Sequence, residues 1–277
     1  MKKSLTKLEG LDRRWIYLII FIAVLVPFIT RLDLPVGRHS PSTTAIYDYI
    51  EELPPGSIIA IAFDYGPSAM PELEPAVRAM VRHAFERDHR IFAMTIHPQG
   101  ALMIRRVLYP LAEEYGKQAG VDYINAGFKP GGVAVILGMG RDIVRVFEDT
   151  DARGQRLSSM PMMQDLRTYD DIAILVDLAA NTLPLAWVAY AHEQYRVQIG
   201  AAVTAVVATD LYTFWKSGQL VGLINGLKGA AEYEDLVSHP GWGVQGMSSQ
   251  SIAHVLIILL IVLGNISYFA SRRRAQA

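Results

Sequence analysis

The sequence has 277 residues, of which 51% are hydrophobic, and its 26 basic and 27 acidic side chains give a net charge of -1. This near-neutral balance gives no reason to expect a nucleic-acid partner. The absence of cysteine excludes disulfides, thiol chemistry and cysteine metal sites; it fits an oxidising compartment, and it also fits the cytoplasm.

Two long apolar runs, residues 15–30 and 252–270, lie near the ends of the chain. Each is close to the length at which a helix crosses about 30 Å of hydrocarbon. Aromatic side chains stand near their outer ends, where the membrane interface favours them. The sequence therefore predicts transmembrane helices at 15–32 and 251–270, through which the protein contacts the lipid bilayer.

The first run is short, but Arg31 can snorkel, and Leu32 and Leu34 can extend the helix. A cleaved signal peptide is the main alternative interpretation of this segment. No small-x-small cleavage site follows it, which favours an uncleaved anchor.

Basic side chains flank both runs and set the expected orientation. They are Lys2, Lys3, Lys7, Arg13 and Arg14 before the first run and Arg272, Arg273 and Arg274 after the second. Because cytoplasmic flanks carry the excess of Lys and Arg, both termini are expected in the cytoplasm and the intervening chain outside the cytoplasmic membrane. The expected organisation is a cytoplasmic tail (1–14), a transmembrane helix (15–32), a linker with a short helix (33–55), an extracytoplasmic α/β domain (56–238), a linker (239–250), a second transmembrane helix (251–270) and a cytoplasmic tail (271–277).

Between the two runs, short apolar segments alternate with amphipathic ones, a pattern typical of strands separated by helices. Strands are expected at Ser57–Phe63, Arg90–Ile96, Asp122–Ala126, Val133–Leu137, Ile172–Val176 and Ile199–Ala208, and helices at Ala45–Leu53, Leu73–Phe85, Ala101–Lys117, Leu183–Tyr195 and Gly218–Ala231. Strands that are apolar on both faces predict a doubly wound, mainly parallel sheet flanked by helices. The predicted fold class is therefore α/β, with one transmembrane helix at each end.

Residues 172–191 and 197–215 are also long and apolar, which suggests a second pair of membrane helices as an alternative. Asp177 and Asp210 lie within these segments, and each would cost roughly 2.5 to 3.5 kcal/mol near the centre of a bilayer. The β-branched residues of the second segment favour a strand. The two-span topology is therefore preferred.

Polar side chains end several of the expected strands: Asp64, His97, Asp177 and Asp210. In a parallel sheet these ends meet at one edge, where open α/β domains bind ligands. His97 could act there as a general base oriented by an aspartate, or Asp64, His97 and Asp177 could bind a metal ion. The structural alternative is that these residues only cap turns. Strand order decides between the two, and no motif indicates a cofactor or defines a metal centre.

The stretch GMGRD offers a second candidate ligand site, because Gly138 and Gly140 follow an expected strand and could open a helix. Their amides could bind an anion with the help of Arg141, and Asp210 is expected at the same edge of the sheet. The third glycine of a dinucleotide fingerprint is missing, so a tight turn is the favoured explanation.

Two features suggest contact surfaces. The long connection 149–170 contains three flexible side chains that suit a partner surface, those of Met160, Met162 and Met163. Three glycines recur every four residues and would form a smooth stripe on the helix expected at Gly218–Ala231, namely Gly218, Gly222 and Gly226. Such a stripe either packs on the sheet or contacts another subunit.

No catalytic signature motif is present, so a catalytic role is the less favoured one. The leading hypothesis is a doubly anchored, extracytoplasmic α/β domain that acts as a non-catalytic subunit or scaffold of a membrane complex. Its partners would be further copies of the chain or other membrane proteins. The alternative is a membrane-tethered hydrolase or transferase that uses Asp64, His97 and Asp177. A small-ligand sensor ranks last, because short tails at 1–14 and 271–277 hold no output domain.

Overall fold

The computed structural model describes residues 12–275, which form two compact units. The first unit combines the chain up to Pro35 with the chain from Val244 onward. The second is the α/β unit, Val36–Gly243.

The α/β unit is built on a sheet of six parallel strands in the order β3-β2-β1-β4-β5-β6. The strands are β1 (Ile58–Asp64), β2 (Arg90–Thr95), β3 (Tyr123–Phe128), β4 (Ile174–Ala179), β5 (Ile199–Val203) and β6 (Gly222–Asn225). The order of the strands reverses between β1 and β4, as it does in doubly wound domains. The predicted α/β architecture with a parallel sheet is confirmed.

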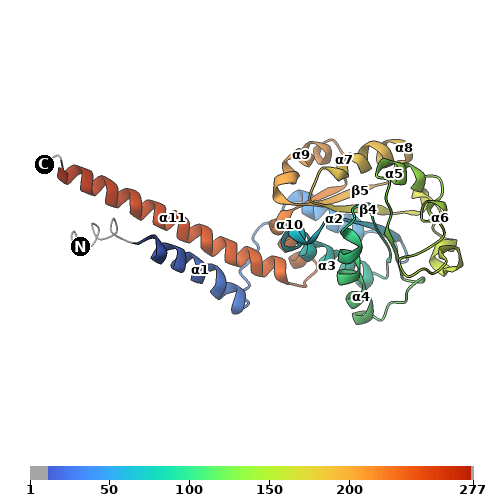
Figure 1. The fold of residues 1–277 in the computed structure, drawn as a ribbon, viewed down its shortest axis with the longest axis horizontal. Helices are drawn as coiled ribbons and strands as arrows, with labels where there is room; N and C mark the ends of the chain where they lie inside the picture. Colours follow the sequence, from blue (N-terminus) through green and yellow to red (C-terminus); the bar gives the residue numbers. More distant parts are fainter. Residues whose placement is uncertain (1–11, 276–277) are drawn as a thin grey trace. The chain divides into compact units, whose positions relative to one another are not determined.

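Helices lie on both sides of this sheet (Figure 1). One apolar core joins the sheet to α2 (Pro41–Glu51), α3 (Met70–Glu86), α4 (Gly100–Glu114) and α10 (Gly226–Leu236). The other joins it to α5 (Val133–Met139), α6 (Ile143–Val146), α7 (Leu183–Trp187), its π-helical continuation η6 (Val188–His192) and α9 (Ala205–Lys216). Short helical turns complete the unit: η2 (Pro67–Ala69), η3 (Leu157–Ser159), η4 (Pro161–Gln164), η5 (Tyr169–Asp171) and α8 (Glu193–Tyr195).

Strand β1 shows how the sequence specifies the two cores. All seven of its residues are buried. Because side chains alternate between the faces of a strand, Ile59 and Ile61 enter the first core while Ala60 and Ala62 enter the second. Continuous apolarity therefore reflects burial on both faces, as expected for a central parallel strand.

Two of the expected strands differ from the structure. Residues 133–137 form a helix, because Gly132 adopts a φ of 52° and starts α5, whose Val135 and Met139 face the core. Short apolar runs do not distinguish a strand from a buried helix. The strand expected at 199–208 ends at Val203, and α9 begins at Ala205.

The expected helix Gly218–Ala231 is also wrong. Residues 222–225 instead pair with β5 as the edge strand β6, and a φ of 53° at Gly226 separates this strand from α10. The glycine stripe therefore does not exist. Gly222 is a close-approach position, because an added Cβ would lie 2.5 Å from the backbone oxygen of Ser42 in α2.

The ends of the chain differ from expectation as well. Among residues 12–275, one helix is long and apolar enough to cross a membrane, at Trp242–Phe269 within α11 (Trp242–Ala275). It begins where the sequence suggested a linker at 239–250. The N-terminal helix α1 (Arg13–Ile29) has 17 residues, about 26 Å, which is less than the hydrocarbon thickness. It ends early because the Thr30 hydroxyl donates to Val26 O and Arg31 adopts a φ of 50°.

We predict that Gly222→Ala lowers the free energy of unfolding of the full chain by about 1 to 3 kcal/mol, because the methyl group would press α2 away from β6. Denaturant unfolding in detergent, followed by circular dichroism, measures this loss. Gly218→Asn is the control, since Gly218 has a φ of 80° with no atom within 4 Å of an added Cβ, and Asn tolerates that conformation. Equal stability of Gly222→Ala and the unmodified chain would show that α2 does not constrain β6.

Candidate functional site

Two buried carboxyl groups meet where the strand order reverses. Asp64 ends β1 and Asp177 lies in β4, in a register that pairs Ala62 with Asp177 and Asp64 with Ala179. The two acids are therefore on neighbouring strands and on the same face of the sheet. Both are 0% exposed.

Asp64 Oδ1 binds the turn that follows β2. It accepts hydrogen bonds from the backbone amides of Ile96 (2.7 Å) and His97 (3.1 Å), and it lies 2.9 Å from the hydroxyl oxygen of Thr95. These donors favour the ionised form of Asp64, although burial raises its pKa overall. Asp64 thus connects the end of β1 to the turn between β2 and α4.

Asp177 has no such donors. Within residues 12–275, no group outside the pair donates a hydrogen bond to either of its oxygens or to Asp64 Oδ2. Burial, and then the charge of Asp64 and the hydrogen bond to it, raises the pKa of Asp177 well above its ordinary value. Burial and the neighbouring Asp64 therefore favour the neutral form of Asp177, which can offer its proton to Asp64.

His97 joins this pair only through its backbone. Its ring Nδ1 lies 3.3 Å from the amide nitrogen of Gln99. Across residues 12–275, no group of three or more histidine and acidic side chains is placed to hold a metal ion. Of the three proposed catalytic residues, the structure brings the side chains of Asp64 and Asp177 together.

The other candidate ligand residues lie elsewhere. Gly138 belongs to α5 and Gly140 packs on the ring of Tyr195, so the GMGRD segment follows a helix and not the expected strand. Arg141 is exposed beside it. Asp210 is exposed on α9 because β5 ends seven residues earlier. A tight turn is the explanation that the sequence favours for GMGRD, and residues 140–141 do lie in a turn after α5.

The methionines of the long connection belong to the core. Met160, Met162 and Met163 are buried in the cluster that covers the second face of the sheet. Their side chains are therefore not available as the surface for a partner that the sequence suggested. Gly218 lies in a turn with a φ of 80°, and a Cβ added to Gly226 would lie 2.9 Å from the backbone nitrogen of Ala205.

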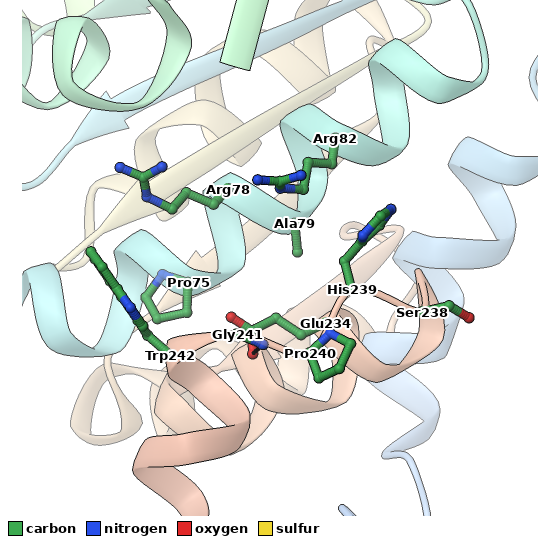
Figure 2. Close-up of a pocket in the computed structure, with 10 residues that line it drawn as sticks. All are labelled: Pro75, Arg78, Ala79, Arg82, Glu234, Ser238, His239, Pro240, Gly241 and Trp242. Carbon is green, nitrogen blue, oxygen red and sulfur yellow. Dashed lines mark hydrogen bonds between the residues drawn. The ribbon is translucent and has the colours of Figure 1, made fainter. Parts of the chain in front are cut away.

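Two cavities lie away from the carboxyl pair. A groove of about 490 Å³ is lined by α3, the end of α10 and residues 238–242, with Arg78, Arg82, His239 and Trp242 around it (Figure 2). A second cavity of about 410 Å³ lies at the end of β3 and is lined in part by Arg105, Asn125 and Lys129.

The groove residues were not among those suggested by the sequence. Arg78 and Arg82 are four residues apart, so they share one face of α3. This spacing is visible in the sequence, but an arginine pair on an amphipathic helix ordinarily faces solvent and does not indicate a groove. The groove forms only in the folded chain, which brings His239 and Trp242 beside the two arginines.

No family model matches the sequence, and no curated protein or solved structure matches it. Arguments about function therefore depend on the geometry of the chain.

We predict that Asp177→Asn stabilises the protein relative to the unmodified chain as the pH rises above about 4. A raised pKa means that the folded state retains a proton that the unfolded state releases, so the unmodified chain loses stability over this range. Asparagine still offers an N–H donor to Asp64 and has no proton to retain. Denaturant unfolding from pH 4 to 8 measures the difference.

Asp210→Asn makes the same chemical change on the exposed face of α9, and we expect an effect within about 0.5 kcal/mol. If the stabilities of the Asp177→Asn variant and the unmodified chain change in parallel with pH, Asp177 is not the protonated partner.

Proposed function

We propose that the protein is a membrane-anchored α/β domain that acts as a non-catalytic subunit or scaffold of a membrane complex. The observation that carries this proposal is the apolar helix Trp242–Phe269, whose side chains are largely exposed. Its 28 residues extend about 42 Å, close to the thickness of a bilayer with its headgroups. A lipid environment would cover an apolar surface that water does not favour.

Helix α1 serves as the second anchor in this proposal. Trp15, Phe21 and Ile29 are among its exposed apolar side chains. The helix is short, so the anchor would need Leu32 and Leu34, with Arg31 reaching back to the headgroups. The basic residues next to both helices favour a topology in which both termini are cytoplasmic and the α/β unit is extracytoplasmic.

Short connections support a role close to the bilayer. Only six residues separate the end of α1 from the start of the α/β unit at Val36. Such a segment reaches roughly 25 Å when fully extended. A domain held in this way is suited to contact other proteins of the same membrane.

The state of the acidic pair favours a non-catalytic role over a hydrolase or transferase. Asp64 and Asp177 are fully buried, and Asp64 Oδ1 is occupied by two backbone amides. General acid–base residues must reach the proton that they transfer. The pair instead connects β1, β4 and the turn after β2.

An exposed apolar side chain offers a contact surface for the partner. Val206, in the first turn of α9, is 83% exposed. A partner that covered Val206 would remove this apolar side chain from water, which is favourable.

We predict that the full chain, extracted from membranes in mild detergent, has a native mass of at least two chains or of one chain with a partner. Val206→Asp is expected to reduce the assembled fraction severalfold, because it would bury a charge in the contact. Native mass spectrometry measures both species. Leu102→Asp makes a similar change at an exposed apolar residue of α4 and is the matched control. A protein that is monomeric and without a partner contradicts the proposed role.

A further inference from the structure

We infer that the groove between α3 and residues 238–242 binds the phosphate group of a membrane lipid (Figure 2). This inference rests on the proposed membrane anchoring. It assigns to the α/β unit a specific lipid-binding site in addition to its anchoring helices.

Trp242 connects the groove to the helix that we propose crosses the membrane. It lines the groove and is also the first residue of the helix Trp242–Phe269. A helix of about 42 Å places its ends among the headgroups on the two sides of a bilayer. Trp242 is 51% exposed, and tryptophan is enriched at that level of the membrane.

Arg78 supplies a positioned cation. Its Nε donates to the buried carboxylate of Glu74 at 2.9 Å, and its Nη2 donates to Arg106 O. Arg106 binds the second oxygen of Glu74 at 2.8 Å, so two guanidinium groups share one carboxylate and retain one net positive charge. Among residues 12–275, Arg78 Nη1 makes no hydrogen bond, so it is available to a ligand.

Arg82 stands one turn further along α3. Its two terminal nitrogens bind both oxygens of Glu114, at 2.6 and 3.0 Å, which fixes the guanidinium in place. Arg82 Nη1 also lies 3.5 Å from the Tyr115 hydroxyl, and its Nε is not used by Glu114 or Tyr115. The arginines are 27% and 26% exposed, so they are held at the groove and do not extend freely into solvent.

Two acidic residues near these arginines, Glu234 and Glu86, form hydrogen bonds with other groups of the protein. The oxygens of Glu234 accept from the amides of Gly241 (2.9 Å) and Gly243 (3.1 Å). Glu86 lies 2.6 Å from His239 Nε2.

The indole ring of Trp242 lies beside Arg78. The guanidinium of Arg78 lies 5.4 Å from the centre of the Trp242 ring.

A phosphate matches this arrangement better than a carboxylate or an apolar ligand does. Guanidinium groups bind phosphate oxygens with paired, charge-assisted hydrogen bonds. The indole ring beside Arg78 offers an apolar surface for the glycerol or upper acyl carbons of the same lipid. A soluble phosphate compound shares the anionic group but not the acyl chains.

The test is native mass spectrometry of the full chain in detergent, titrated with phosphatidylglycerol. Arg78→Gln and Arg82→Gln each remove one guanidinium, and Glu114 is exposed, so the second change leaves no buried charge unpaired. Arg105→Gln is the matched control, because Arg105 is exposed on α4, outside the groove. A parallel titration with glycerol 3-phosphate tests the soluble source.

We expect each groove variant to weaken phosphatidylglycerol binding roughly tenfold to a hundredfold, as for the loss of a charge-assisted hydrogen bond, and Arg105→Gln to leave it unchanged. Equal binding by groove variants and control overturns the inference. Glycerol 3-phosphate binding as tight as that of the lipid overturns the assignment to a membrane lipid. Release of the chain from membranes by alkaline carbonate would instead contradict the anchoring itself.

Discussion

The pairing of β1 with β4 is the constraint on which the rest of the α/β unit depends. The sheet reverses its order at this pair, so chain segments on either side of it wind in opposite directions. The same pairing brings two carboxyl groups together without solvent. The two groups can be buried together because the raised pKa of Asp177 favours its neutral form. Two ionised carboxylates at that position would repel each other in a medium of low polarity. The acids at the strand ends therefore act first as a structural connection between β1, β4 and the turn after β2.

Much of the fold could be predicted because buried strands and half-buried helices have recognisable patterns of apolar residues. A central strand such as Ile58–Asp64 is buried throughout and appears as an unbroken apolar run. Amphipathic periodicity likewise predicted a helix at Leu73–Phe85, which lies within the observed helix Met70–Glu86. The errors occurred where one short apolar pattern fits two structures. Residues 133–139 and 222–225 are both brief apolar segments beside glycines, and only tertiary contacts make the first a helix and the second a strand.

The candidate sites were harder to predict for a physical reason. That Asp64 and Asp177 lie on neighbouring strands follows from strand order, which no local pattern specifies. The burial of Met160 and the exposure of Asp210 depend on where the long connection packs and where β5 ends. The groove joins Arg78 to Trp242 across more than 160 residues of sequence, so its chemistry appears only in three dimensions.

These features combine in a single account of the protein. We propose that an apolar helix and a shorter one attach the α/β unit to a bilayer. The buried acidic pair lies at the centre of its sheet, and the arginine groove includes Trp242, the first residue of the longer helix. The proposed role assumes that the α/β unit lies outside the cytoplasm. Positive flanking charges support this orientation.

The most direct test of the account is the location of the α/β unit. The chain has no cysteine, so Gln155→Cys introduces a single thiol at an exposed position. The account predicts that a membrane-impermeant maleimide labels this thiol in intact spheroplasts, while a cysteine in place of Ser4 is labelled only after lysis. Labelling of position 155 only after lysis would place the α/β unit in the cytoplasm and contradict the account.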